Sequence, residues 1–340
     1  MIMRGLTLPL RYTLLSLAIL FTVTPAAAID LPERRKDQFL TDSGYYLVPA
    51  PYSIPGLGEG LIIIGAMTNV KNSHTDIYGF AAGGDIKGYG MFGTEMHLVK
   101  KKLLLDLMHT NFDKASSQIY SQRGMNTSAD DFILADLDHA VFTGARLTYT
   151  QFDRRLEIYG VLYKNESRLS AIRDSDGNLI QSTVDSETSK SETYTYGMRL
   201  DLTDDYIDPR QGIRAEASLW HTPPGNDDAP YYDIIELNLT GYVPMGSRHT
   251  LALNYFHADT QVNRQGQTDP SKVEQDLGLD CSSGSAQDQA DCQSIINNRI
   301  AENTYGSVGS LGGLSRLRSV PEDRFKGSHA RFVGIEFRWN

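Results

Sequence analysis

The sequence has 340 residues and a formal net charge of −10, with 42 acidic and 32 basic side chains. This acidic balance argues against a nucleic-acid partner. Apolar residues make up 40% of the chain and charged residues 22%, which is too polar for a protein that crosses a membrane with helices. The same composition suits a β-barrel, whose inner face is wet.

The N-terminus has the pattern of a secretory signal peptide. Arg4 and Arg11 supply positive charge, residues 14–22 (LLSLAILFT) form a short apolar core, and residues 26–28 are alanines. The alternative, a membrane helix, needs about 20 apolar residues, and this core is shorter. We therefore predict a signal peptide over residues 1–28, cleavage before Ile29 and export from the cytoplasm.

Residues 29–58 contain several prolines, and we expect them to form an extended periplasmic segment. A further strand around Tyr45–Tyr52 is the alternative for part of this segment. The segment is too short to hold a folded polypeptide-binding repeat before the first predicted strand.

Apolar and polar residues alternate in successive segments from residue 59 onward. In one of them, Ile235, Leu237 and Leu239 share one face of a strand, and Glu236 and Asn238 face away. A soluble sandwich also alternates, but these segments run about ten residues, the length that a tilted membrane strand needs. We predict about eleven strands, near residues 59–70, 75–86, 89–99, 101–110, 140–151, 153–164, 191–204, 210–221, 230–242, 248–259 and 329–339.

The predicted links between strands fall into two length classes. Short links are expected at 151–154, 204–211 and 244–248, and long ones at 111–139, 164–190 and 260–328. Short turns on one side and long loops on the other are typical of an outer-membrane barrel. The predicted fold class is therefore all-β, a transmembrane antiparallel β-barrel over residues 59–340. The predicted location is the cell outer membrane of a Gram-negative bacterium.

The loop over residues 260–328 is long for a compact barrel. Ile295, Ile296 and Ile300 have helical spacing, which predicts a short helix over residues 287–303. Cys281 and Cys292 lie close together in a polar stretch of the same loop. In an exported protein we expect them to form a disulfide. The alternative, a zinc site, lacks a nearby histidine and a suitable spacing.

Two blocks of sequence resemble the bacterial surface antigen family, the BamA/TamA superfamily of outer-membrane assembly and translocation proteins. The first is Leu311–Ser319 (LGGLSRLRS), followed by residues 324–327 (RFKG) and the strand 331–339. The second is residues 204–212 (DDYIDPRQG), which is similar to the family's Asp…Pro-x-x-Gly periplasmic turn. Ser319 and Val320 replace the glycine and aromatic residue of the family's loop motif.

The resemblance implies which residues carry function. Gly312 and Gly313 precede Arg318, which we predict to latch the loop to the barrel wall. A buried guanidinium needs a carboxylate, and the candidates on the inner face are Glu336, Glu216 and Glu236. The resemblance places the partner on the strands after the loop, which include that of Glu336 and extend beyond residue 340. An exposed surface arginine is the alternative. The turn residues Asp208, Pro209 and Gly212 are expected to be structural.

The resemblance also implies about 16 strands in a complete barrel, with about 11–12 present here. The last predicted strand is followed only by Asn340. Because an odd number of strands leaves unpaired edges, which lipid does not tolerate, we expect the sequence to be a fragment.

No catalytic motif supports an enzyme. Residues 88–93 match G-x-G-x-x-G, but a strand rather than a helix follows them. The resemblance implies a noncatalytic, monomeric barrel in outer-membrane lipid, without cofactor or metal. Unfolded outer-membrane proteins or a periplasmic partner are its expected protein partners. The alternatives are a passive outer-membrane channel or structural surface barrel and, less favoured, a hydrolase on the barrel rim.

Overall fold

The computed structural model describes residues 43–54, 58–120, 122–182, 188–224, 228–246, 249–309, 311–313, 316–321 and 324–339. Every described residue lies in one compact unit of the chain, Arg34–Asn340. The predicted signal peptide over residues 1–28 lies outside the described residues.

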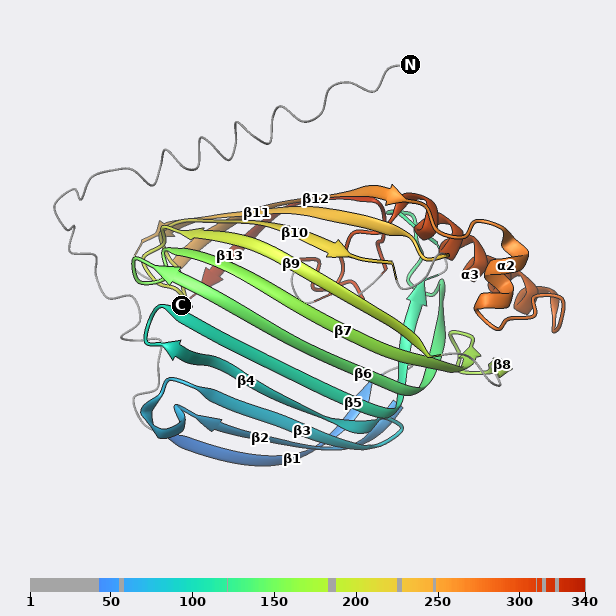
Figure 1. Cartoon of the computed structure of the whole chain (residues 1–340), viewed down its shortest axis with the longest axis horizontal. Helices are drawn as coiled ribbons and strands as arrows, with labels where there is room; N and C mark the ends of the chain where they lie inside the picture. The colour runs from blue at the N-terminus through green and yellow to red at the C-terminus, as the bar shows by residue number, and fades with distance from the viewer. Residues whose placement is uncertain are drawn as a thin grey trace, which may run out of the picture. The chain divides into compact units, whose positions relative to one another are not determined.

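The described part of the chain is built on one antiparallel sheet (Figure 1). Its path runs from β1 to β7 and then from β9 to β13, each strand pairing with the next, and β8 pairs with the end of β7. The strands are β1 (Gly44–Ile54), β2 (Gly58–Thr68), β3 (Asp76–Gly84), β4 (Lys87–Val99), β5 (Leu103–Tyr120), β6 (Phe132–Gln151), β7 (Leu156–Arg173), β8 (Leu179–Ser182), β9 (Ser189–Asp201), β10 (Gly212–Thr222), β11 (Tyr231–Met245), β12 (His249–Arg264) and β13 (His329–Trp339).

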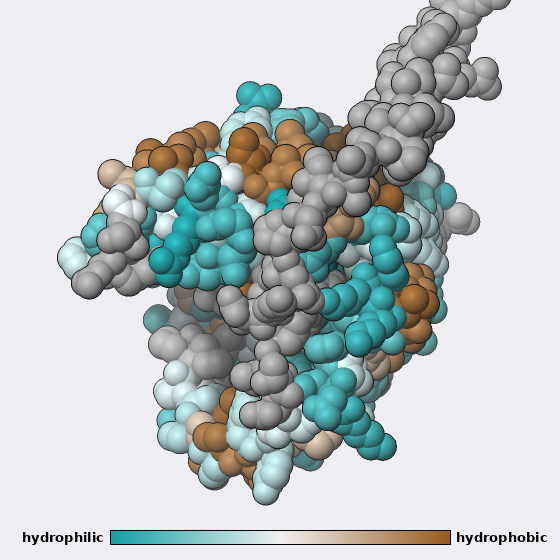
Figure 2. All heavy atoms as spheres, turned by 90° about the vertical axis from the view of Figure 1, so that its left-hand side faces the viewer, coloured by the Kyte–Doolittle hydropathy of each residue, from teal (hydrophilic) through white to brown (hydrophobic). Residues whose placement is uncertain are grey.

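In a water-soluble sheet the apolar face is buried and the polar face is exposed. In this sheet the polar face is buried and the apolar face is exposed. Glu157 and Asp201 are 0% exposed, whereas Ile235 is 53% and Leu239 is 42% exposed. We call the face that carries Glu157 the inner face and the face that carries Leu239 the outer face. Seen from the end with the short turns, hydrophobic residues lie along the margins and hydrophilic residues between them (Figure 2).

Cross-strand register extends each face over several strands. Glu157 of β7 lies opposite Arg199 of β9, which lies opposite Glu216 of β10, and Glu216 lies opposite Asn238 of β11. Because directly opposed residues point to the same side of a sheet, these polar side chains share the inner face. The all-β class and the antiparallel sheet of the predicted fold are confirmed.

Three central strands are longer than predicted. β5, β6 and β7 have 18, 20 and 18 residues, about twice the length that crosses a membrane. The loops expected at 111–139 and 164–190 are therefore wrong over much of their length. The strand extensions carry polar residues together with buried apolar residues such as Ile133 and Ile172, so they show no regular alternation. Side-chain hydrogen bonds link the extensions of neighbouring strands: Asp136 of β6 accepts from Ser116 Oγ of β5 (2.7 Å) and from Arg173 Nε of β7 (2.6 Å).

The sheet also begins earlier than predicted, within the segment expected to be periplasmic. β1 pairs with β2 along its whole length, from Gly44 opposite Thr68 to Ile54 opposite Gly58. Pro49 and Pro51 lie two residues apart, so their nitrogens point to the same side, away from β2, and the N–H groups that face β2 remain intact. The alternative of a strand around Tyr45–Tyr52 is thus correct, and the described residues contain 13 strands rather than about 11–12.

The long segment between β12 and β13 contains two helices, α2 (Pro270–Asp276) and α3 (Ala286–Tyr305). α3 confirms the helix predicted over 287–303, and Ser285 and Asp288 form its N-terminal capping box. A short 3-10 helix, η1 (Val70–Asn72), lies between β2 and β3. No helix in the described residues has the length and apolar character needed to cross a membrane.

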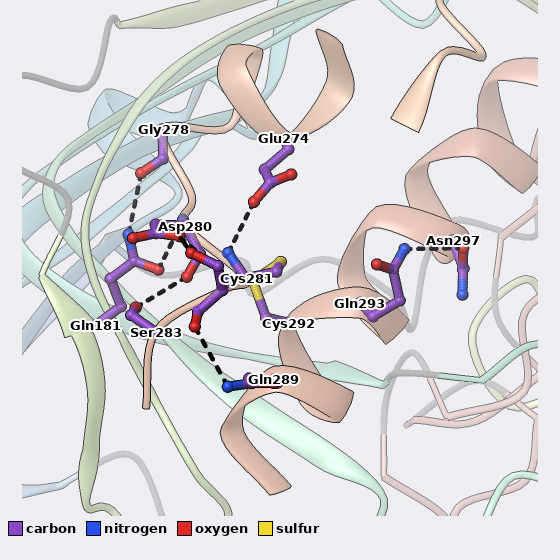
Figure 3. The surroundings of a disulfide bond; sticks show 11 residues. Gln181, Glu274, Gly278, Asp280, Cys281, Ser283, Gln289, Cys292, Gln293 and Asn297 are labelled. Carbon is purple, nitrogen blue, oxygen red and sulfur yellow. Dashed lines mark hydrogen bonds between the residues drawn. A yellow bond between two sulfur atoms is a disulfide. The ribbon is translucent and has the colours of Figure 1, made fainter. Parts of the chain in front are cut away.

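The helices pack on the extended ends of β6 and β7. Val273 of α2 and Ile296 of α3 are buried with Ile133 and Ile172 of those strands. Cys281 and Cys292 are joined by a disulfide, with their Cα atoms 5.4 Å apart (Figure 3). Gln181 of β8 fixes the same segment, donating to the Gly278 carbonyl and accepting from Asp280 N–H (Figure 3). We call residues 265–305 the helical cap.

Candidate functional site

The chain returns from α3 to β13 through residues 306–328, which we call the inner loop. Its Val308 and Leu311 are buried together with Phe256 and Ala258 of β12 and Ala330 of β13. Phe256 lies opposite Asn238 and so belongs to the inner face. The inner loop therefore packs against the inner face of β12 and β13.

The predicted Gly312–Gly313 pair forms a tight turn in the inner loop. The Gly313 N–H donates to the Val320 carbonyl at 2.9 Å. A Cβ atom on Gly312 would lie 2.0 Å from the Pro321 carbonyl oxygen, and Gly313 has φ +91°. Both positions therefore require glycine for a physical reason. Residues 314–315 of the same motif lie outside the described residues.

Arg316 of the inner loop stacks on an aromatic ring of β12. Its guanidinium carbon lies 3.3 Å from the ring centroid of Phe256, which is 1% exposed. Burial lowers the pKa of Arg316, and the negative charge of Glu236 on β11 opposes that shift. The contact thus combines a cation–π interaction with a nearby carboxylate.

Beside Arg316 lies a cavity of about 210 Å³ whose lining is mainly polar. Glu236 and Trp220 meet there, and the Trp220 indole N–H donates to Glu236 at 3.1 Å. Arg146 of β6 also lines the cavity, with its guanidinium carbon 3.9 Å from the ring centroid of Tyr159. The inner loop and the wall therefore enclose a polar space with charges of both signs.

The predicted latch, Arg318, makes a weaker contact. Its Nη2 lies 3.4 Å from Glu336 Oε2, and the two side chains are 64% and 42% exposed. Ion pairs this exposed contribute little to stability. Arg318 as a latch stays a prediction, whereas Arg316 was not singled out from the sequence. One signal could have found it: Phe256 is an aromatic residue on the polar face of its strand.

A second polar cluster lies on the inner face near the short turns. Arg154, in the β6–β7 turn, donates to Glu157 at 2.5 Å and also pairs with Glu95 of β4. Arg199 Nη1 lies 3.3 Å from Glu157, and its Nη2 lies 2.9 Å from Glu216. Since Glu157 is 0% exposed, its charge depends on these two arginines.

Tyr206 inserts the β9–β10 turn into this cluster. The Arg154 guanidinium lies 4.0 Å from its ring centroid, and Arg199 donates to its hydroxyl at 3.0 Å. Burial, followed by the charge of Glu157, raises the pKa of Tyr206 above its ordinary value. The hydroxyl therefore stays protonated while its oxygen accepts the bond from Arg199. Sequence reasoning missed this cluster because its members come from four separate segments of the chain.

The turn predicted at Asp208, Pro209 and Gly212 is held by other acidic residues. Asp204 accepts hydrogen bonds from the main-chain N–H groups of Arg210 and Gln211, at 2.9 and 3.0 Å. Gly212 has φ +111°, and a Cβ there would lie 2.3 Å from the Leu202 carbonyl oxygen. Pro209 is buried, whereas Asp208 is exposed and lies 3.8 Å from Arg210.

The hydrogen bonds that Asp204 accepts change the pKa of its carboxyl group. Partial burial raises the pKa of its carboxyl, but the hydrogen bonds from Gln211 and Arg210 lower it further than burial raises it. The net pKa lies below the ordinary value, so the ionised carboxylate stabilises the turn. Among the described residues, no group of three or more His, Cys, Asp and Glu side chains is arranged to hold a metal ion.

Comparisons with solved structures show distant structural similarities. No protein-family profile matches the sequence, and no curated protein matches it. The fold is similar to that of BamA from Haemophilus ducreyi, crystallised without POTRA domains 1–3, with 14% identity and a TM-score of 0.39. The similarity covers 65% of this chain and 41% of that BamA chain. At this distance it identifies neither a family nor an activity.

Proposed function

We propose that this chain is an outer-membrane β-barrel protein of a Gram-negative bacterium that crosses the membrane with its strands. One observation carries the proposal: carboxylates such as Glu157 are buried on the inner face, and residues such as Leu239 are exposed on the outer face. A continuous apolar surface is unfavourable in water and matches the hydrocarbon of a bilayer. Lipid is the proposed partner of the outer face, and the protein acts as a single barrel.

We propose further that the protein acts without catalysis or cofactor, in assembly of outer-membrane proteins or in polypeptide translocation. The support is the resemblance of the inner-loop motif and of the turn at 204–212 to the surface antigen family. Unfolded outer-membrane proteins are the proposed clients, and a periplasmic protein is the proposed delivery partner. The inner loop suits such a role because it lies on the inner face outside the strand ladder. It is held there by side-chain packing, by the Arg316–Phe256 contact and by single hydrogen bonds such as that from Gly124 N–H to the Lys326 carbonyl at 2.7 Å.

A passive channel is the second candidate. The observation that favours it is the polar cavity beside Arg316, where Arg146 and Glu236 line a space of about 210 Å³. Positive and negative side chains across such a space would select small hydrated solutes by charge. If the protein is a passive channel, the inner loop narrows the path that solutes take through it.

Two measurements separate these candidates. The first is the abundance of folded outer-membrane proteins in cells after depletion of this protein, with restoration by wild type and by a variant that lacks residues 306–328. A reduced abundance that only wild type restores supports assembly. The second is conductance of the purified protein in planar bilayers. An unchanged protein profile together with steady conductance that rises in Arg316→Ala contradicts assembly and supports the channel.

A further inference from the structure

Three neighbouring turns at the short-turn end are tied to one another. The rings of His74, after η1, and His97, near the end of β4, lie 5.4 Å apart between centroids. Thr150 at the end of β6 donates its N–H to the Lys102 carbonyl at 2.8 Å. Lys102 Nζ in turn donates to Gln151 Oε1 at 2.9 Å. The β2–β3, β4–β5 and β6–β7 turns therefore form one continuous surface.

Three exposed lysines on this surface have no carboxylate partner in the described part of the chain: Lys71, Lys100 and Lys102. Lysines near the opposite end of the strands behave differently. There Lys87 pairs with Asp113, Lys114 with Asp85, Lys164 with Glu192 and Lys190 with Glu166. Within the described residues, these four lysines thus have acidic partners, whereas Lys71, Lys100 and Lys102 at the other end have none and can contact an external anion.

Exposed apolar side chains lie next to Lys100 and Lys102, at the ends of β4 and β6. Leu98 is 56%, Val99 is 53% and Phe152 is 61% exposed. Tyr149, 44% exposed, and Val99 both lie opposite Leu103, so they continue the outer face down to the turns. We call these four residues and the three lysines the basic-apolar patch. It places positive charge just beyond the end of the apolar outer face.

We propose that the basic-apolar patch binds anionic phospholipid headgroups in the leaflet next to the short turns. This inference rests on the proposed membrane location of the outer face. A lysine at the boundary reaches the headgroup phosphates while its stem follows the acyl chains. The apolar members of the patch favour a lipid over a free phosphate, which would leave them in water. The acidic turn that contains Asp204 and Asp205 repels such headgroups, so the lipid is held on the side of β2 to β7.

The test uses the full chain, refolded into vesicles of phosphatidylcholine alone and into vesicles in which phosphatidylglycerol replaces a third of it. Insertion is measured first, by protection of the strands from protease. Bound lipid is then counted by native mass spectrometry after extraction in detergent. The lysines are neutralised together as Lys71→Gln, Lys100→Gln and Lys102→Gln. The control neutralises three lysines near the other end, as Lys87→Gln, Lys114→Gln and Lys190→Gln.

We expect wild type and the control to retain phosphatidylglycerol in preference to phosphatidylcholine, and the turn-end variant to lose about tenfold or more of that preference. Retention should also fall with added salt, because the contact is with exposed charges. Equal preference in the two triple variants overturns the inference while leaving the membrane location intact. Failure of wild type to insert into either kind of vesicle overturns both. Competition by glycerol phosphate as strong as by phosphatidylglycerol contradicts a lipid ligand.

Discussion

Arg316 and Arg318 lie two residues apart in the inner loop, yet their surroundings differ. Arg316 stacks on the buried ring of Phe256, and Arg318 extends toward Glu336 with most of its side chain in solvent. A partly desolvated cation–π contact contributes about 1–2 kcal/mol, and an exposed ion pair about 0–1 kcal/mol. The position of Arg316, rather than its charge alone, makes it the stronger contact.

We therefore predict that Arg316→Ala loosens the inner loop more than Arg318→Ala does. Limited proteolysis of the refolded protein, read out as the rate of cleavage within residues 306–328, measures the difference. Arg318→Ala serves as the matched control because it removes the same charge from the same loop. A faster cleavage in Arg318→Ala than in Arg316→Ala contradicts this assignment and restores Arg318 as the latch.

The tight turn of the inner loop should depend on glycine at position 312. The Pro321 carbonyl occupies the space that a Cβ atom would need, so Gly312→Ala should open the turn at a cost of about 1–3 kcal/mol. Hydrogen exchange of the Gly313 and Val320 amides should become faster. Gly309→Ala is the control, since nothing lies within 4 Å of a Cβ placed there. Equal exchange in the two variants would show that the turn does not depend on Gly312.

The ionisation of Asp204 should make the stability of the β9–β10 turn depend on pH. Its pKa is lowered in the folded protein, so its contribution is present above the ordinary aspartate pKa of about 3.9 and is lost as the pH falls through the lower folded value. Asp204→Asn should lower the melting temperature at neutral pH. The difference from wild type should shrink as the pH falls below about 4. A difference that is independent of pH would exclude the ionised carboxylate as the cause.

At the scale of elements, the helical cap depends on its disulfide. Cys281 and Cys292 close a loop with a sequence separation of 11, and Cys292 belongs to the buried cluster that holds the cap on β6 and β7. A loop of this length contributes about 2–3 kcal/mol by restricting the unfolded chain. The double substitution Cys281→Ser and Cys292→Ser should therefore raise hydrogen exchange in α2 and α3. Exchange in β9 to β11 should stay unchanged, and a matching rise there would contradict a separate cap.

The strands differ in how well the sequence predicts them. β10 to β13 follow the alternation closely because one face of each is apolar and the other polar, as in Ile235, Leu237 and Leu239 of β11. The outer parts of β5, β6 and β7 were missed because contacts such as Ser116–Asp136 replace alternation there. β1 was left as an alternative because Pro49 and Pro51 are ordinarily absent from paired strands.

The inner-face contacts were predictable only in part. Gly312, Gly313 and the turn at 204–212 stand out because backbone geometry restricts the residue type. The cluster of Arg154, Glu157 and Arg199 does not, since its geometry depends on strand register that no local pattern encodes. The disulfide partners were predictable because only two cysteines are present and they lie close together.

At the scale of the molecule, the reversed burial of the two faces is the feature from which the proposed function follows. In water, an outer face of this kind would favour aggregation. In a bilayer the same sheet satisfies both faces, because lipid covers the leucines and the inner face keeps paired charges and water. The helical cap and the basic-apolar patch then lie toward opposite ends of the strands.

The most direct test of the membrane location is a fluorescence scan along β11 after refolding into vesicles. Single cysteines carrying a fluorescent label replace residues 235 to 240 one at a time, and quenching is compared between brominated lipid and aqueous iodide. We predict that lipid quenches labels at Ile235, Leu237 and Leu239, and that iodide quenches labels at Glu236, Asn238 and Thr240. Quenching by iodide alone at all six positions, without the period of two, would contradict the membrane location of the outer face.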